Sequence, residues 1–447
     1  MLVATMLRFI PLLRLILHTT LPVVEDCNPL EPPQTVREER WPLLIFSHGL
    51  GGTRNAYSHL CGSLASHGLV VAVPEHRDGS GPISFINEAD KTKRKAIEYR
   101  AISHTQTPEV EEARDEQLKI RCWELGLLHE ALLKIDLGEQ LTNLLHPETS
   151  STANPQTALS AFRSRLDIHT PGKISWSGHS FGATTIVQFT KCVFYPGIAP
   201  LYTSSPSHAL SRQITPASPI SLLDLWTLPI LSHATSALRE KPLPAYTVSD
   251  IRPSPPLTIL SDGFYKWRSN LLNTLETVCP PATYSSATTP TAVRPDIFYP
   301  LHSAHLSQSD FGVLFPWLTK RFLKAEEPER LLRLNLEEKG VSVADTSALD
   351  RENVNKDFEG QGVPELVNHA GEKGEEGADG LALGQDHTIL AKDGGVRGWI
   401  AVDPIQEFKR LKGDTEEEGQ EDMKANGEAI GEPKGPADAV MKNEIIK

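Results

Sequence analysis

The sequence predicts an α/β protein with a mostly parallel central sheet flanked by helices. Short apolar runs, each the length of one strand, recur along the first 325 residues, and segments with a helical pattern separate several of them. Strands that are apolar on both faces are typical of parallel sheets covered by helices. With 447 residues, the chain is long enough for one large domain or two of average size.

The first half of the predicted fold contains two strands and two helices. WPLLIFS, at Trp41–Ser47, is a buried-strand pattern that ends just before a cluster of glycines. LVVAVP, at Leu69–Pro74, is a second such run, and a helical stretch around Tyr57–His67 joins the two. The spacing of apolar residues predicts a long helix at Glu109–Leu137. These apolar residues are Leu118, Cys122, Leu125 and Leu128.

The second half of the predicted sheet has three further strands. Lys173–Ser177 is one of them, and a serine between glycines and a helix through Phe189 follow it directly. Pro256–Leu260 and Asp296–Tyr299 are the last two strand-like runs before residue 325. Apolar strands that alternate with helices in this way favour parallel pairing.

The negative charge of the chain is concentrated in its C-terminal part. Residues 326–447 hold 29 acidic and 15 basic side chains, a net charge of −14, whereas the whole chain carries −13. Residues 1–325 are therefore nearly neutral, which gives no electrostatic indication of nucleic-acid binding. We expect one folded domain over residues 1–325 and an acidic, low-complexity, disordered tail over residues 326–447. GWIAVDPIQEFKRL (Gly398–Leu411) is interpreted as a stray apolar patch in that tail, in preference to a segment that orders or binds a partner.

The cysteines and histidines do not indicate a metal or cofactor. The five cysteines are scattered, and none forms a Cys-x-x-Cys pair: Cys27, Cys61, Cys122, Cys192 and Cys279. Their odd number and spacing predict neither a disulfide framework nor a zinc site. No grouping of His, Cys and carboxylates has metal-ligand spacing. We expect no metal and no cofactor, and the cysteine usage favours a reducing, cytoplasmic compartment.

The first twenty residues, MLVATMLRFIPLLRLILHTT, are apolar but contain Arg8, Pro11 and Arg14. The arginines argue against a signal peptide, and together with the proline they argue against a transmembrane helix. An amphipathic helix over residues 1–17 fits best, either packed on the domain or lying at a lipid surface. The sequence favours packing on the domain and leaves a peripheral membrane contact as the alternative.

The serine between glycines belongs to a motif with a chemical meaning. Residues 178–182 read GHSFG, which is a G-x-S-x-G pattern at a predicted strand-to-helix turn. Such a turn lifts the serine out of the sheet, and its glycines let neighbouring elements approach closely. A serine hydroxyl becomes a strong nucleophile only when a base removes its proton. Ser180 is therefore the candidate nucleophile of an acyl-transfer reaction.

Acyl transfer also needs hydrogen-bond donors for the developing oxyanion. One donor in such sites is the N–H of the residue after the nucleophile, which here is Phe181. The other comes from a glycine-bearing loop after an earlier strand, and FSHGLGG (Phe46–Gly52) is in that position. The backbone N–H groups of Leu50 and Phe181 are the candidate oxyanion-hole donors.

Two blocks of the sequence resemble one known family. FSHGLGGTRNAYSHLCGSLASHGLVVAVPEHRDGS and GHSFGAT are similar to the platelet-activating-factor acetylhydrolases, which are serine esterases with an α/β-hydrolase fold. The resemblance covers about residues 1–325. It implies calcium-independent hydrolysis of the sn-2 ester of phospholipids that carry short or oxidised acyl chains. It also implies that Leu50 and Phe181 occupy the family's oxyanion positions.

The candidate base is His305, because LHSAHLSQSDF follows the last strand-like run and matches the family's Ser-x-His followed by Asp-Phe. His302 competes only by proximity and is interpreted as structural. His76 is interpreted as part of a structural polar cluster with Arg77 and Asp78.

The candidate acid is one of four aspartates between Ser180 and the base: Asp224, Asp250, Asp262 and Asp296. The stretch LLDLWTLPI resembles the family's Leu-Asp-x-Trp-x-x-Pro block, and this resemblance selects Asp224. Position alone favours Asp262, at the end of the LTILSD strand. We favour Asp224, because a triad is recognised by geometry and roles and not by chain position.

The resemblance also raises a question about the start of the fold. Family members carry strands upstream of the block that begins here at Trp41, and only forty residues precede it. We expect the first edge strands of the sheet to be missing, through truncation or an incomplete gene model. Two alternatives to a phospholipid esterase stay open: a general carboxylesterase acting on soluble esters, and a catalytically silent scaffold with this fold.

Overall fold

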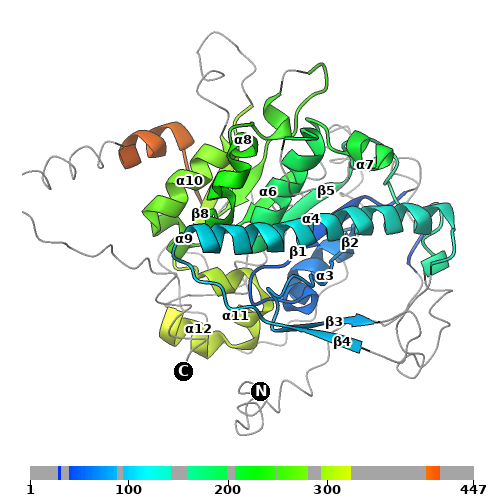
Figure 1. The fold of residues 1–447 in the computed structure, drawn as a ribbon, viewed down its shortest axis with the longest axis horizontal. Coiled ribbons are helices and arrows are strands. Elements are labelled where there is room, and N and C mark those ends of the chain that lie inside the picture. The colour runs from blue at the N-terminus through cyan, green and yellow to red at the C-terminus, as the bar shows by residue number, and fades with distance from the viewer. Residues whose placement is uncertain are drawn as a thin grey trace, which may run out of the picture.

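The structure is a computed structural model, and it describes residues 29–31, 40–87, 94–141, 159–198, 207–247, 249–279, 293–323 and 399–412. The chain folds around a seven-stranded, mostly parallel sheet with helices on both faces, which confirms the predicted fold class (Figure 1). The predicted helix over residues 1–17 and most of the predicted tail lie outside the described residues. Among the helices that are described, none is both long and apolar enough to cross a membrane.

The main sheet brings the carboxyl ends of its parallel strands to one edge. In spatial order its strands are β2 (Val70–Ala72), β1 (Leu43–Ser47), β5 (Ser175–His179), β6 (Ile220–Leu223), β7 (Leu257–Ile259), β8 (Asp296–Pro300) and β9 (Trp399–Ala401). All neighbouring pairs are parallel except β8 and β9. Residues that directly follow β1, β5, β6 and β7 therefore lie near one another. The five predicted strands are present, and the sequence missed β6 and β9.

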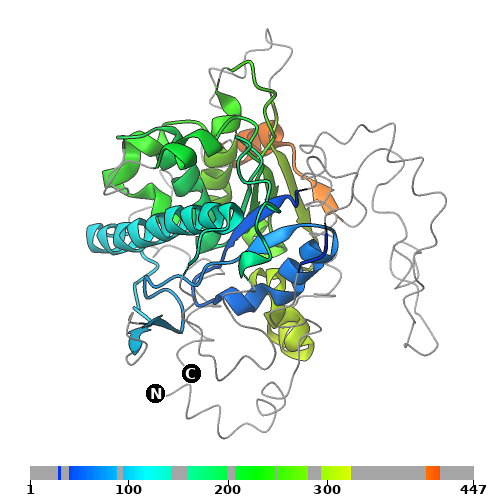
Figure 2. The same ribbon diagram turned by 90° about the vertical axis from the view of Figure 1, so that its right-hand side faces the viewer.

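Helices cover both faces of the sheet, and the core is divided accordingly. Along β1, Leu43 and Ile45 pack into one apolar cluster with α4 (Pro108–Leu137) and α6 (Phe181–Phe194). Leu44 and Phe46 face the other cluster, which includes Leu60 and Leu64 of α3 (Ser58–Ser66). Figure 2 shows α4 and α3 on opposite sides of the sheet. This alternation explains why a strand buried on both faces appears in the sequence as a continuous apolar run.

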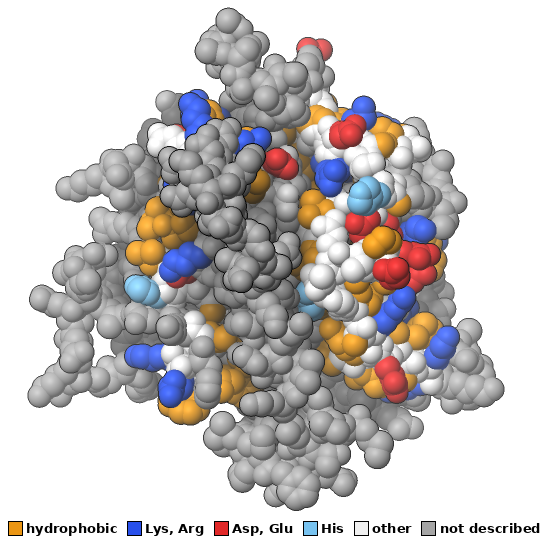
Figure 3. Space-filling view, turned by 60° about the vertical axis from the view of Figure 1, so that its left-hand side comes forward, with side chains coloured by type: hydrophobic (Ala, Val, Ile, Leu, Met, Phe, Trp, Pro, Cys, Tyr) orange, Lys and Arg blue, Asp and Glu red, His pale blue; other side chains and the backbone are white. Residues whose placement is uncertain are grey.

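The remaining described elements are short. A two-stranded antiparallel hairpin joins β3 (Ile83–Asn87) to β4 (Arg94–Glu98). The other α-helices are α7 (His208–Gln213), α8 (Ser236–Arg239), α9 (Asp262–Lys266), α10 (Arg268–Val278), α11 (Asp310–Leu314) and α12 (Pro316–Leu323). Short 3-10 turns are η2 (Arg54–Tyr57), η4 (Leu228–Leu231), η5 (His233–Thr235), η6 (Pro244–Tyr246) and η8 (His305–Gln308). On the face drawn in Figure 3, acidic and basic side chains of the described residues are interspersed with apolar ones.

One segment of the predicted tail belongs to the folded domain. Strand β9 pairs antiparallel with β8, and residues 404–412 that follow it are helical. Leu411 is 2% exposed and joins the main apolar cluster, while its carbonyl accepts a hydrogen bond from Arg268 Nη2 at 2.6 Å. The interpretation of Gly398–Leu411 as a stray patch was wrong, and the domain extends past the predicted boundary at residue 325. The apolar run of β9 is isolated in a long acidic, low-complexity stretch, and this composition led to its interpretation as part of the tail.

Candidate active site

The candidate nucleophile lies at a sharp turn between β5 and α6. Ser180 has φ 56° and ψ −116°, a backbone conformation that non-glycine residues rarely adopt. The flanking glycines make this turn possible. A Cβ atom on Gly178 would lie 2.4 Å from the carbonyl carbon of Gly182, and one on Gly182 would lie 1.9 Å from the carbonyl oxygen of Ser47. The G-x-S-x-G pattern therefore corresponds to the tight strand-to-helix turn that the sequence predicted.

The sheet register places Ser180 beside Asp224. His179 is paired with Leu223 across β5 and β6, so Ser180 and Asp224 each come one residue after the last paired position. The Ser180 N–H donates to the Leu223 carbonyl at 2.8 Å, and the Asp224 N–H donates to the Ile259 carbonyl of β7 at 2.8 Å. Three neighbouring strands thus fix the backbone at the carboxyl edge of the sheet.

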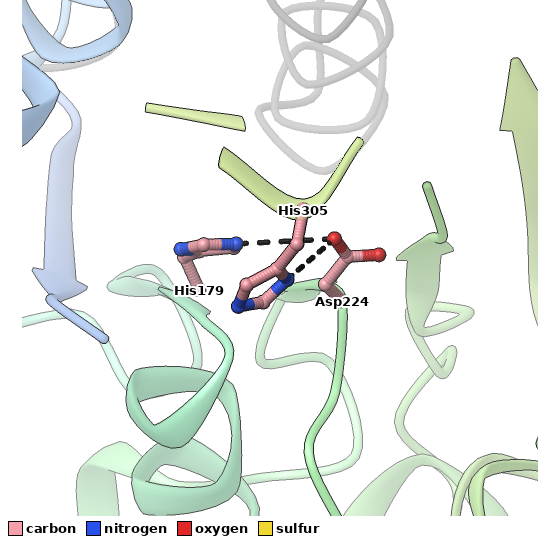
Figure 4. A group of neighbouring side chains, drawn as sticks. All are labelled: His179, Asp224 and His305. Atoms are coloured by element: carbon pink, nitrogen blue, oxygen red, sulfur yellow. Dashed lines mark hydrogen bonds and ion pairs between the residues drawn. The ribbon is translucent and has the colours of Figure 1, made fainter. Parts of the chain in front are cut away.

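The structure brings Asp224 and His305 into direct contact. His305 Nδ1 lies 2.8 Å from Asp224 Oδ2, and the carboxylate is fully buried (Figure 4). The other carboxylate oxygen accepts a hydrogen bond from the Ser261 N–H. The His305 ring stacks on Phe264, with ring centroids 4.4 Å apart and an angle of 11° between the planes. The carboxylate and the stacked ring together fix the orientation of the imidazole.

The pKa of Asp224 reflects two opposing effects. Burial alone would raise the pKa of this carboxyl, because the charged form loses its hydration. Contacts with His179 and His305 outweigh burial and hold the pKa below its usual value. Asp224 is therefore ionised at neutral pH and can accept a hydrogen bond from the protonated Nδ1 of His305.

A second histidine and a tyrosine complete this cluster, and the sequence did not predict either. His179 Nε2 lies 3.9 Å from Asp224 Oδ2, which is a charge contact and too long for a hydrogen bond. The Tyr57 hydroxyl lies 2.8 Å from His179 Nδ1 and accepts a hydrogen bond from the Gly49 N–H at 3.0 Å. The hydroxyl can then donate to Nδ1, which places the His179 proton on Nε2, facing Asp224.

His179, Asp224 and His305 also have the residue types that bind metals. Their ligand atoms lie within 4.8 Å of one another, and they form the one such group in the part of the chain that the structure describes. Asp224 and His305 are already hydrogen-bonded to each other through Oδ2 and Nδ1. These two atoms are the ones that a triad acid and base would use to bind each other.

In the loop after β1, the backbone N–H groups on both sides of Leu50 are hydrogen-bonded within the protein. The Gly49 N–H donates to the Tyr57 hydroxyl, the Gly51 N–H to the Ser80 carbonyl at 2.8 Å, and the Gly52 N–H to the Gly49 carbonyl at 3.1 Å. The N–H of Leu50 donates to no acceptor among the described residues. The N–H of Phe181 likewise has no acceptor among the residues that the structure describes. This pattern is what an oxyanion hole requires before the substrate binds.

Among the described contacts, neither the side chain of the alternative acid Asp262 nor that of the alternative base His302 pairs with Asp224 or His305. Asp262 begins α9, and its Oδ2 atom pairs with Lys266 Nζ at 2.6 Å. His302 is exposed and has φ 57°, whereas His305 faces the buried carboxylate of Asp224.

The polar cluster at residues 76–78 is partly as predicted. His76 and Asp78 are buried, and His76 lies between Ser47 Oγ (2.9 Å from Nε2) and Glu124 Oε2 (2.8 Å from Nδ1). Arg77 differs from the prediction, because its side chain is exposed. Since Ser47 and His76 are both completely buried, this Ser-His-Glu arrangement offers no access to a substrate.

Comparisons with known proteins found one matching family and several relatives of similar sequence. The profile of the family described as "Platelet-activating factor acetylhydrolase, isoform II" matches residues 5–360. A putative phospholipase A2 from Schizosaccharomyces pombe is 28% identical over 305 residues, covering 66% of this chain and 65% of that protein. A platelet-activating factor acetylhydrolase from Gallus gallus is 27% identical over 243 residues, 52% of this chain and 47% of that protein. The corresponding protein of Cavia porcellus is 35% identical over 154 residues, 34% and 32% of the two chains.

These matches span between about a third and two thirds of the length of the relatives. Among solved structures, a ferulic acid esterase from Streptomyces cinnamoneus has a TM-score of 0.37 and 14% identity, covering 68% of this chain and 67% of that chain. That likeness is too distant to support an inference.

Proposed function

The chain belongs to the platelet-activating factor acetylhydrolase isoform II family, and on that premise we propose that it is a serine-dependent carboxylic ester hydrolase. Its proposed substrates are platelet-activating factor and related phospholipids with a short or oxidised acyl chain at sn-2. The observation that carries the proposal is the 2.8 Å contact between His305 and the buried Asp224, beside the strained turn that holds Ser180. The nucleophile then follows the end of β5, the acid follows the end of β6, and the base lies at the start of η8.

The proposed reaction passes through an acyl-enzyme. Ser180 Oγ attacks the ester carbonyl carbon while His305 Nε2 takes the hydroxyl proton, and Asp224 stabilises the resulting imidazolium. The Leu50 and Phe181 N–H groups hydrogen-bond the oxyanion. His305 returns the proton to the leaving oxygen, so a lysophospholipid departs. Water, deprotonated by His305, then cleaves the acyl-enzyme and releases a short carboxylic acid.

We propose that the reaction is independent of calcium. The proton acceptor is the His305 imidazole, and backbone N–H groups are the oxyanion donors, so each charge that develops has a protein partner. A calcium chelator should therefore leave the rate unchanged.

A series of phosphatidylcholines with sn-2 chains of increasing length tests the substrate proposal. We expect acetyl and short oxidised chains to be hydrolysed and palmitoyl chains to be poor substrates, with and without chelator. Hydrolysis of soluble esters alone would favour a general carboxylesterase. No labelling by a fluorophosphonate ester would favour a silent scaffold, because such reagents need an activated serine.

We also propose a peripheral contact with the lipid surface through residues 1–17, which lie outside the described residues. This stretch carries Leu, Ile, Val, Phe and Met side chains around Arg8 and Arg14 and contains no acid. Such a helix can bury its apolar side at the headgroup boundary while the arginines stay near phosphates.

Removing residues 1–17 tests this contact. We expect binding to phosphatidylcholine vesicles to fall by at least tenfold, while hydrolysis of a soluble short-chain ester continues at the original rate. Equal vesicle binding would contradict the proposal. An insoluble protein that has lost both activities would show that the helix is packed on the domain.

A further inference from the structure

A buried ion pair joins the middle of α4 to the loop that follows β2. The Nε atom of Arg121 lies 2.6 Å from Asp78 Oδ2, and both side chains are fully buried. A second guanidinium nitrogen, Nη2, donates to Ser80 Oγ, which in turn donates to Asp78 Oδ1. We propose that Arg121 is a positioning residue that holds the Leu50 and Phe181 N–H donors in place for the oxyanion. This inference rests on the proposed function and adds a residue to it.

One set of contacts fixes the glycine-rich loop. Arg121 Nη1 donates to the carbonyl of His48 at 2.9 Å, two residues before Leu50. On the other side of Leu50, the Gly51 N–H donates to the carbonyl of Ser80, whose hydroxyl is bound by Arg121. The peptide that bears the Leu50 N–H is thus anchored on both sides by groups that Arg121 contacts.

A second set of contacts fixes the first turn of α6. The same Nη1 atom lies 3.3 Å from Thr185 Oγ1, and this hydroxyl donates to the carbonyl of Phe181 at 2.8 Å. The guanidinium carbon lies 4.3 Å from the centroid of the Phe181 ring, which is completely buried. Arg121 therefore contacts the loop that contains Leu50 and the side chain of Phe181, the two segments that carry the candidate oxyanion donors.

The chemistry of the guanidinium explains why an arginine occupies this position. Its planar fork offers several donors in fixed directions, whereas a lysine offers one compact charge. Burial would raise the pKa of Asp78, but Arg121, His76 and Ser80 together outweigh it and lower the pKa to about 2. The pair therefore stays ionic although it is buried. A buried ion pair often adds little net stability compared with apolar residues of similar size, so the role of this pair is inferred from the groups that Arg121 holds in place.

Two variants and one matched control test the proposal in the full-length chain. Arg121→Lys keeps the charge but loses the fork, and Ser80→Ala removes one hydroxyl between Arg121 and Asp78. The control is Arg40→Met, which breaks the 2.8 Å pair between Arg40 and Asp136 near the end of α4. Residues 121 and 136 are about 22 Å apart along the helix, at about 1.5 Å per residue. The readouts are kcat and KM for a short-chain ester, the Ki of a trifluoromethyl ketone analogue, and the melting temperature.

We expect the Arg121→Lys variant to lose about 10²-fold in kcat, comparable to the loss of one oxyanion donor, with KM within about threefold. The Ki of the ketone should rise by the same factor, because Ser180 adds to its carbonyl and forms an oxyanion in the same hole. Ser80→Ala should show a smaller parallel change, on the order of tenfold. Arg40→Met should lower the melting temperature without changing kcat or Ki.

The proposal is overturned if kcat falls in the Arg121→Lys variant while the ketone Ki stays constant, or if both stay at the control values. If Arg121→Lys does not fold, Ser80→Ala decides by the same two readouts. Failure of the proposed function gives a different result, because the wild-type protein itself would then show no Ser180-dependent hydrolysis and no ketone inhibition.

Discussion

The Ser180→Ala variant should lose ester hydrolysis by on the order of 10⁶ in turnover, the loss that follows removal of a triad nucleophile in a serine protease. The fold should persist for a structural reason. Ser180 has φ 56°, and alanine carries the same Cβ atom, so the strain of the turn does not change. The N–H of residue 180 still donates to the Leu223 carbonyl. Only the hydroxyl that forms the acyl-enzyme is lost.

Turnover of a short-chain ester and labelling by a fluorophosphonate ester both measure this effect. The wild-type protein should be labelled at Ser180, as peptide mapping can show, and the variant should not be labelled. A melting temperature close to that of the wild type excludes unfolding as the cause. Turnover above about a hundredth of the wild-type value would remove Ser180 from the mechanism.

The second large effect is expected for the acid. Asp224→Asn should lower turnover by roughly 10⁴, because an amide can donate to His305 Nδ1 and stabilise the wrong tautomer of the imidazole. The matched control is Asp262→Asn. Asp262 pairs with Lys266, which is two-thirds exposed, so its loss should change turnover by no more than a few fold.

Turnover of both variants, measured at equal substrate saturation, decides between the two aspartates. Melting temperatures should be recorded with them, since Asp224 is buried and also accepts a hydrogen bond from the Ser261 N–H. The reverse ranking of the two variants would assign the acid to Asp262.

The sequence predicted those parts of the fold and site that depend on local patterns. The turn at Ser180 follows from a strand, two glycines and a helix that are contiguous in the chain. Asp224 required the resemblance to a family, because the apolar run of β6 continues past Asp224 into LWTLPIL and no turn residue marks where the strand ends. Chain position alone favoured Asp262, which comes after β7. In the structure it is Asp224, the residue after β6, that contacts His305.

Other parts of the site could not be predicted because their partners are distant in the chain. Tyr57 and His179 are 122 residues apart, and Arg121 and Asp78 are 43 apart. One signal was nevertheless present for Arg121. It lies three residues after Leu118 and four before Leu125, so it occupies the apolar side of α4. A charged residue on the buried side of a helix indicates a paired or functional role.

The late position of β9 in the sequence has a consequence for biosynthesis. All the candidate catalytic residues precede residue 306, whereas β8 acquires its native outer partner only when Trp399–Ala401 has been made. At about 5–20 residues per second, the roughly 100 residues between β8 and β9 take on the order of 5–20 s to synthesise. During that interval the outer edge of β8 on the nascent chain lacks its native strand and resembles the exposed edges through which chains associate. A nascent chain that ends between these two strands therefore already contains all the candidate catalytic residues, while the outer edge of its β8 is open to association with other chains.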